Sequence, residues 1–303
     1  MNPCHRPILV FALLLTALPG ATHEARAQNA ETVTLTDVHG LSYSPDGKSL
    51  LLAHHHGIAV YAAGKWSRSS GPQHDYMGFS ATKDHFYSSG HPAPGSGLVN
   101  PMGLMRSIDG GKSWVKLSLE GESDFHLLAT SYGANAVYVY NPGPNSKMKA
   151  PGIHYTLNNG FVWNRAQASG FNGAPTSLAV HPSDPKVVAI GSKDGLYLST
   201  NSGDSFRAIA TGQQTLAAFF DLDGTHLLVS SYAGAPALVR VNWKTGAKRS
   251  LTLPPMARDA VAYIAQNPAN RIEYAIATFG RSVYITRDGG QSWQQIARDG
   301  KGL

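Results

Sequence analysis

The stretch SIDGGKSW at residues 107–114 decides the fold, because close variants of it return three more times. The variants are TLNNGFVW (156–163), STNSGDSF (199–206) and TRDGGQSW (286–293). All four fit Ser/Thr-x-Asp/Asn-x-Gly-x-x-Trp/Phe, and their first residues lie 49, 43 and 87 positions apart, the last spacing being close to twice 43. A recurrence of roughly 40–50 residues is typical of repeat architectures, in which each repeat is one supersecondary unit.

Each copy predicts a tight turn between two strands. The acidic or amide residue caps the turn with its side chain, and the glycine supplies a positive φ that other residues disfavour. The aromatic residue then begins the next strand and packs under the turn. The capping residues are Asp109, Asn158, Asn201 and Asp288, and the aromatic residues are Trp114, Trp163, Phe206 and Trp293.

Four copies with this internal spacing resemble the Asp-box, or BNR repeat, of sialidase-like and sortilin-like β-propellers. The resemblance covers nearly all of the chain after its first residues, and it suggests an exported bacterial member of that superfamily. It implies that each box lies between the third and fourth strand of a blade, where it is structural rather than catalytic. No catalytic residue is carried over by the resemblance.

Tracing backwards from the boxes yields six units that each begin with an apolar strand. These strands are HGLSY (39–43), MGFSA (77–81), HLLAT (126–130), TSLAV (176–180), LAAFF (216–220) and AYIAQ (262–266). The first and fifth units lack a good box. We predict an all-β, six-bladed propeller of four-stranded antiparallel blades, with seven blades as the alternative. Residues 33–36 are expected either to add an edge strand or to close the ring against the last blade.

The first 27 residues are predicted to be a signal peptide. An apolar run at residues 8–18 is short for a bilayer span, and Ala25-Arg26-Ala27 is a typical cleavage site. Residues 28–303 then form a single propeller domain with no integral membrane segment, placed in the periplasm or secreted. The single cysteine, Cys4, lies in the leader, so disulfides and thiolate metal sites are excluded from the remaining chain.

Composition and motifs exclude several classes of function. The formal net charge is +6, but lysine and arginine do not cluster, so nucleic acid is not an expected partner. The sequence contains no P-loop, no Gly-rich dinucleotide turn after a strand, and no Gly-x-Ser-x-Gly nucleophile elbow. Nucleotide-dependent and serine-hydrolase chemistry are therefore not supported.

Histidines of the first three units indicate a binding site on the channel face, where inner strands begin. The gap-free alignment places His39, Met77 and His126 at one equivalent position, and His55 and His91 follow second strands. Imidazole and thioether ligands together suit copper, whereas histidines with carboxylates would suit zinc. Packing in a polar channel is the alternative. The first hypothesis is therefore a binding protein that holds a metal ion, with copper as its expected cofactor.

Two other functions stay open, and with them the question of whether the protein is an enzyme. A BNR-type glycoside hydrolase would need two carboxylates, for which the channel face offers Asp75, Glu122, Asp124 and Asp259. A sialidase is disfavoured, because its arginine clamp and Arg-Ile-Pro segment have no counterpart here. The third hypothesis is an interaction or assembly scaffold, with an unknown protein, peptide or glycan bound at the channel face.

Overall fold

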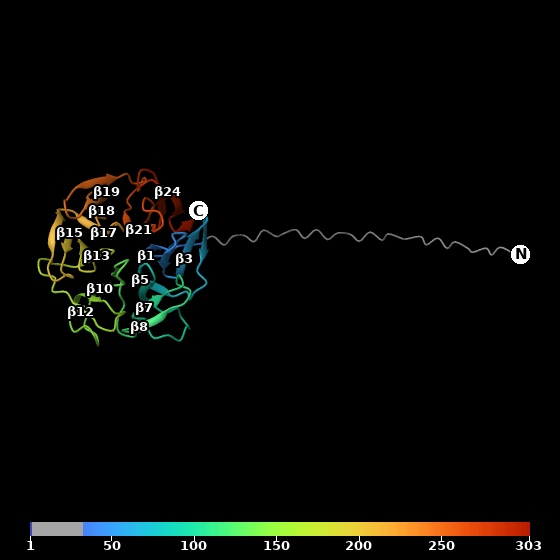
Figure 1. Ribbon diagram of the computed structural model, residues 1–303, viewed down its shortest axis with the longest axis horizontal. Helices are drawn as coiled ribbons and strands as arrows, with labels where there is room; N and C mark the ends of the chain where they lie inside the picture. The colour runs from blue at the N-terminus through green and yellow to red at the C-terminus, as the bar shows by residue number, and fades with distance from the viewer. Residues whose placement is uncertain (2–32) are drawn as a thin grey trace. The chain divides into compact units, whose positions relative to one another are not determined.

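The computed structural model describes residue 1 and residues 33–303, and the account below concerns the latter. Within that range the chain forms six antiparallel sheets around a common centre (Figure 1), five of four strands and one of five. The predicted six-bladed, all-β propeller is therefore confirmed, and the seven-bladed alternative is wrong. The predicted signal peptide and its cleavage site lie outside the described residues.

Blades 1 to 3 occupy the first half of the described chain, each numbered from its innermost strand outward. Blade 1 contains β1 (Val38–Tyr43), β2 (Ser49–His54), β3 (Gly57–Ala62) and β4 (Lys65–Arg68). Blade 2 contains β5 (Asp75–Ala81), β6 (Phe86–His91), β7 (Leu104–Ser107) and β8 (Val115–Ser118). Blade 3 contains β9 (Leu128–Thr130), β10 (Val137–Asn141), β11 (Gly152–Thr156) and β12 (Asn164–Arg165).

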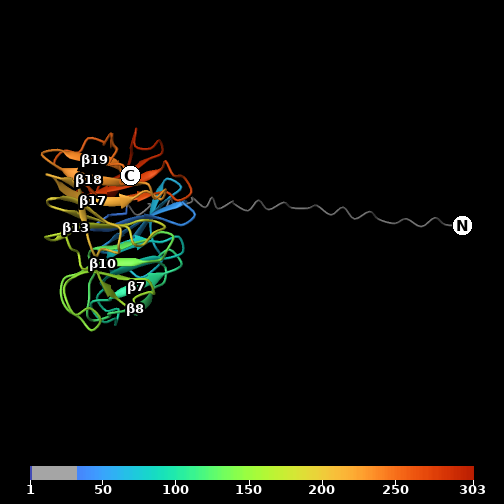
Figure 2. The same ribbon diagram turned by 60° about the vertical axis from the view of Figure 1, so that its left-hand side comes forward.

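Blades 4 to 6 repeat the arrangement, and the outward stacking of β17, β18 and β19 is visible in Figure 2. Blade 4 contains β13 (Pro175–Val180), β14 (Val188–Ser192), β15 (Gly195–Ser199) and β16 (Arg207–Thr211). Blade 5 contains β17 (Gln214–Phe220), β18 (His226–Tyr232), β19 (Pro236–Asn242) and β20 (Lys248–Leu251). Blade 6 contains β21 (Val261–Gln266), β22 (Tyr274–Thr278), β23 (Val283–Thr286), β24 (Gln294–Arg298) and β25 (Lys301–Gly302).

The ring is closed by the start of the described chain. Each inner strand contacts the next in chain order, and β21 contacts β1. Residues 33–35 extend the last blade beyond β25: the Leu35 N–H donates to the Gly300 carbonyl at 2.6 Å, and the Gly302 N–H donates to the Val33 carbonyl at 3.0 Å. Of the two alternatives for residues 33–36, pairing with the last blade is the one that the structure shows, through residues 33–35.

The hydrophobic core lies between the blades rather than within them. Six clusters of buried side chains each combine two neighbouring blades, including the pair formed by blades 6 and 1. Between blades 1 and 2, for example, Leu51 and Ile58 pack with Tyr76 and Phe86. Both faces of a blade are apolar because each is covered by a neighbour, which is why strands such as β2 and β14 are almost continuously buried.

The four boxes lie between the third and fourth strands of their blades, as predicted. In the last box the Thr286 hydroxyl donates to Asp288 Oδ1 at 2.7 Å, and the Ser292 N–H donates to the same oxygen at 3.0 Å. Gly290 has a φ of +86°, and a Cβ there would overlap Leu251 of the preceding blade. Each box therefore shapes a turn and packs one blade on its predecessor.

Strand direction sorts the loops onto two faces. Because neighbouring strands are antiparallel, the segments that enter inner strands share one face with the turns between second and third strands; we call this the channel face. The boxes, together with the turns between first and second strands, lie on the opposite face, the box face. Residues of the boxes are thus separated from the predicted binding residues by the thickness of the ring.

Candidate metal centre

A β-bulge near the start of the inner strand sets which side chain faces the central channel. In four blades one residue is skipped by the pairing between inner and second strand: His39, Thr176, Leu216 and Ala262. All four line the cavity along the channel. Bulges re-aim a side chain next to functional sites, and blade 1 is the one of these four that places an imidazole there.

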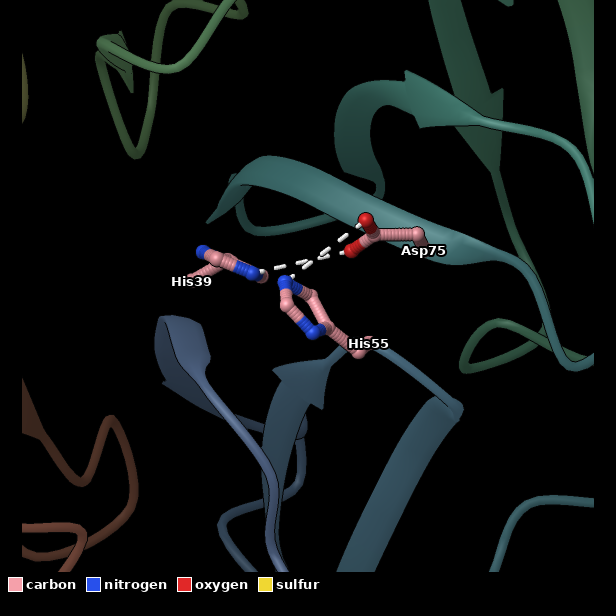
Figure 3. A group of neighbouring side chains, drawn as sticks. All are labelled: His39, His55 and Asp75. Atoms are coloured by element: carbon pink, nitrogen blue, oxygen red, sulfur yellow. Dashed lines mark ion pairs between the residues drawn. The ribbon is translucent and has the colours of Figure 1, made fainter.

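Three side chains from blades 1 and 2 converge at this point of the channel face (Figure 3). His39 Nε2 lies 3.6 Å from Asp75 Oδ1, and His55 Nε2 lies 3.8 Å from Asp75 Oδ2. His39 is the bulge residue of β1, His55 lies in the turn between β2 and β3, and Asp75 begins β5. One ligand atom from each residue lies within 4.8 Å of the others.

The separations in this cluster are longer than hydrogen bonds and close to those around an ion. Metal–ligand bonds of about 2.1 Å in tetrahedral geometry place the ligand atoms about 3.4 Å apart. His39 Nε2 and Asp75 Oδ1 are both buried and have no hydrogen-bond partner, a condition that native structures rarely leave without an ion or water. The residues therefore fit a site with two imidazoles and one carboxylate.

A second carboxylate lies near one of the two imidazoles. Asp37 Oδ2 lies 3.7 Å from His55 Nδ1, on the side of the ring away from Asp75. The rings of His39 and His55 lie with centroids 4.8 Å apart. A carboxylate near the second nitrogen of a ligating histidine is a common arrangement, since it fixes the ring and increases its basicity as a ligand.

The electrostatics of the cluster favour an uncharged imidazole at His39. Burial lowers the pKa of His39 below its ordinary value; Asp75 opposes this effect, and the neighbouring His55 adds to it. The neutral ring has a free lone pair, which is the form that binds a metal ion. Within residues 33–303 no lysine or arginine forms an ion pair with Asp75, so no side-chain cation of those types competes for the site.

The other two predicted histidines form a separate group on blades 2 and 3. His126 Nε2 and His91 Nε2 lie 2.7 Å and 3.1 Å from the same oxygen of Asp124. His91 Nδ1 lies 2.6 Å from Asn100 Oδ1. The two distances to Asp124 are shorter than those in the first cluster, so Asp124 contacts both imidazoles directly. His126 still lines the channel mouth together with His39.

Met77 differs from the position that the gap-free alignment assigned to it. In blade 2 the bulge falls between Met77 and Ser80, so Met77 is a regular paired residue opposite Ser89, whereas His39 is itself the bulge residue. Met77 is 6% exposed, and its neighbour Gly78 is among the residues that line the channel. The equivalence of Met77 with His39 is therefore wrong, because a bulge shifts the alternation by one residue. Its role as a ligand stays a prediction.

Two carboxylates considered for hydrolysis serve as local anchors. Glu122 accepts hydrogen bonds from the Ser146 backbone and hydroxyl at 2.6 and 2.7 Å, and these bonds lower its pKa. Asp259 accepts the N–H groups of Ala260 and Gly280. Asp75 and Asp124 face imidazoles as described above. Glu122 and Asp259 are therefore hydrogen-bonded within this chain, whereas Oδ1 of Asp75 and Oδ1 of Asp124 are buried without a hydrogen-bond partner among the described residues. The assignment of the four as catalytic residues stays a prediction.

A second His/Asp cluster lies on the box face of blade 5. Asp221, Asp223 and His226 also offer ligand atoms within 4.8 Å of one another. Here, however, Arg240 Nε lies 2.5 Å from Asp221 Oδ2, and its Nη2 lies 2.9 Å from Asp223 Oδ2. The Arg240 guanidinium supplies the positive charge that a metal ion would otherwise provide, so we interpret this cluster as a structural ion pair.

The sequence reasoning did not single out Asp37 or the Arg240 pair. Asp37 lies two residues before His39 in the segment that enters β1, so its position next to a candidate ligand was a usable signal. Arg240 is on β19, and its partner Asp221 directly follows β17. That contact depends on how β17, β18 and β19 pair, and no local pattern marks it.

Solved structures with a similar fold include GH74 enzymes and a propeller with a bound peptide. No protein-family model and no curated protein matches the sequence. The GH74 enzyme of Niastella koreensis is similar with TM-score 0.59 and 15% identity over 87% of this chain and 46% of that one. The GH74 xyloglucanase of Xanthomonas campestris has TM-score 0.55 and 14% identity over 88% and 46%. YCF48 bound to D1 peptide has TM-score 0.53 and 17% identity over 88% and 83%.

These likenesses define the class of protein. The chain is a six-bladed β-propeller related in fold to GH74 xyloglucanase and YCF48. It spans less than half the length of the GH74 structures. In the part of the chain that the structure describes, no helix is long and apolar enough to cross a membrane.

Proposed function

We propose that this protein is an exported β-propeller that binds one transition-metal ion through His39, His55 and Asp75. The observation that carries the proposal is the buried, unpartnered pair of His39 Nε2 and Asp75 Oδ1, 3.6 Å apart, with His55 Nε2 beside them. Its location in the periplasm or outside the cell rests on the leader sequence. Binding, rather than catalysis, is the primary role.

The donor set narrows the choice of metal. Two imidazoles and one carboxylate are the ligands of many zinc sites, and copper(II) accepts the same nitrogen and oxygen donors. Copper, expected from the His/Met pattern, remains our proposed cofactor in its divalent form, with zinc as the competing ion. Copper(I) would need a soft ligand such as Met77, so it binds more weakly unless that thioether joins the site.

The test is a metal titration of the protein without its leader. After treatment with a chelator, copper(II), zinc and copper(I) are added separately, and stoichiometry and affinity are measured by calorimetry. We expect one divalent ion per chain and a loss of at least 100-fold in affinity in the His39→Ala, Asp75→Asn double variant, since two of three ligands are removed.

The matched control is His226→Ala, which removes a histidine from the cluster that Arg240 neutralises. Its affinity should equal that of the unmodified protein. Equal binding by the double variant, or a dissociation constant in the micromolar range or weaker for every ion, would contradict the proposal. A loss confined to copper(I) in Met77→Leu would instead show that the thioether contributes.

A second candidate function is peptide binding at the channel face. This chain and YCF48 cover most of each other's length, 88% and 83%, and that structure contains a bound peptide. The GH74 structures are matched over less than half of their length, so glycoside hydrolysis has less support than a scaffold role. A chromogenic glycoside panel with Asp75→Asn and Asp124→Asn as controls tests the hydrolase alternative.

A further inference from the structure

The channel that begins beside the metal centre is a cavity of about 230 Å³ lined by the inner strands of all six blades. No aspartate, glutamate, lysine or arginine is among its lining residues. Apart from tyrosines, its ionisable groups are His39 and His126, both at the channel-face mouth. The cavity is therefore uncharged along its length and carries imidazoles at one end.

Three hydroxyl groups of the wall form hydrogen bonds within the wall, whereas the Tyr43 and Ser177 hydroxyls are buried without a partner in the described chain. The Thr176 hydroxyl donates to the Thr215 carbonyl at 2.5 Å, the Thr130 hydroxyl donates to the Ala81 carbonyl at 2.6 Å, and Ser80 pairs with Thr130 at 2.9 Å. The apolar lining includes Leu41, Phe79, Leu178, Leu216, Phe219 and Ile264. An apolar cavity of about 150 Å³ suffices to bind benzene, so this one has room for an aryl or short alkyl group.

The mouth of the channel carries an exposed aromatic side chain. Phe279 is 61% exposed and lines the cavity. It lies between β22 and β23, a turn between second and third strands, and hence on the same face as His39 and His55. An apolar ring at the rim, beside a candidate ion, offers contact to the hydrocarbon part of a ligand whose polar group reaches the ion.

We propose that the metal-loaded protein binds a small monocarboxylate whose carboxylate completes the coordination of the ion while its apolar group fills the channel. This rests on the proposed metal centre. Three protein ligands leave one position open on a four-coordinate ion, and carboxylate oxygen is an accepted ligand there. His39 belongs both to the metal cluster and to the cavity wall, so the two parts of the ligand are recognised side by side.

Charge balance favours a monocarboxylate over a neutral or cationic molecule. Around a divalent ion, two neutral imidazoles and the ionised Asp75 leave one positive charge among the directly bound groups. A single carboxylate neutralises it. The rest of the ligand must be uncharged, because the channel is lined by no aspartate, glutamate, lysine or arginine and an unpaired buried charge is costly.

The experiment is calorimetric titration of the zinc-loaded protein with straight-chain carboxylates from acetate to octanoate, with the corresponding primary amides as neutral controls. Burial of each added methylene should tighten binding about 3- to 4-fold until the channel is full, and the amides should bind at least 10-fold more weakly. Ala262→Phe, which fills the channel at the bulge of blade 6, should abolish the dependence on chain length without changing zinc affinity.

A second variant keeps the proposal testable if Ala262→Phe fails to fold. Leu216→Ala enlarges the channel at the bulge of blade 5 and should shift the preferred chain to greater length, whereas Ile108→Ala, exposed on the box face, should change nothing. If neither zinc nor copper(II) binds, the proposed function fails. If zinc binds tightly but octanoate binds no better than acetate, only the present inference is overturned. Equal octanoate binding by metal-free protein also overturns it.

Discussion

Two clusters in this propeller consist of histidine and aspartate side chains, but only one of them also contains an arginine. His39, His55 and Asp75 lie on the channel face, and Asp221, Asp223 and His226 lie on the box face. In the second cluster Arg240 lies within hydrogen-bond distance of both carboxylates. In the first, polar atoms are buried at separations too long for hydrogen bonds. The box-face cluster thus contains its own cation, whereas the channel-face cluster, for which we propose a metal ion, contains none from the described chain.

The largest effect should come from removing the internal cation of the box-face cluster. In Arg240→Met, Asp221 is left without its partner although its side chain is fully buried; burial raises the pKa of Asp221 even with Arg240 present. Breaking a buried pair costs about 3–5 kcal/mol of unfolding free energy, measured by urea denaturation. Arg249, the register partner of Arg240 on β20, is the control: Arg249→Met should cost less than about 1 kcal/mol.

The next effect is the stabilisation of the channel-face cluster by an external cation. With free zinc or copper(II) at about 100 times its dissociation constant, the unfolding free energy should rise by about 2.7 kcal/mol. The rise should disappear in His39→Ala and persist in His226→Ala. A persistent rise in His39→Ala would place the ion elsewhere and remove the distinction between the two clusters.

A smaller effect is expected when the carboxylate of the channel-face cluster is neutralised without metal. In chelator-treated protein, Asp75→Asn should change the unfolding free energy by less than about 1 kcal/mol, or even raise it slightly. The reason is that no lysine or arginine of the described chain pairs with this carboxylate, so little favourable interaction is lost. A loss above about 2 kcal/mol would make Asp75 a structural residue like Asp221.

The smallest effect concerns the other carboxylates of the box face. Hydrogen bonds from the Ser292 hydroxyl and backbone, and from Thr286, hold the pKa of Asp288 below its usual range. Such a carboxylate stabilises the fold above its unfolded pKa of about 3.8, and this contribution is lost as the pH falls through the folded value. Melting temperatures of Asp288→Asn should therefore fall less between pH 5 and pH 2. Asn158→Asp, which adds a carboxylate to a box that has none, should show the reverse.

The fold could be predicted because its decisive interactions are local. Within each box the hydroxyl of the first residue, the capping side chain and the glycine N–H bond to one another over a few residues, as in Ser107, Asp109 and Gly111. Local contacts of this kind leave a pattern in the sequence. Four such patterns mark blades 2, 3, 4 and 6, and the apolar inner strands mark the two blades without a box.

The candidate site could be predicted only in part, because its geometry depends on strand pairing across blades. His39 and His55 were predicted as ligands, and Asp75 was named on the same face as a candidate carboxylate for hydrolysis. The place of Met77 was not, since the bulge of blade 2 falls after Met77 and nothing in the local sequence marks that shift. His91 and His126 contact Asp124 instead of joining His39. This contact likewise depends on how blades 2 and 3 pack against each other.

Because residues 33–35 close the ring, this closure must be a late step in the folding of the chain. The partners of Val33 and Leu35, Gly302 and Gly300, are separated from them by nearly the whole described chain. Residues 33–35 therefore have no pairing partner until β25, the last strand of the described chain, has been synthesised. Contacts between residues so far apart in sequence also form slowly. The cluster of His39, His55 and Asp75, in contrast, needs only blades 1 and 2. A nascent chain could acquire its ligand cluster long before the propeller becomes a closed ring.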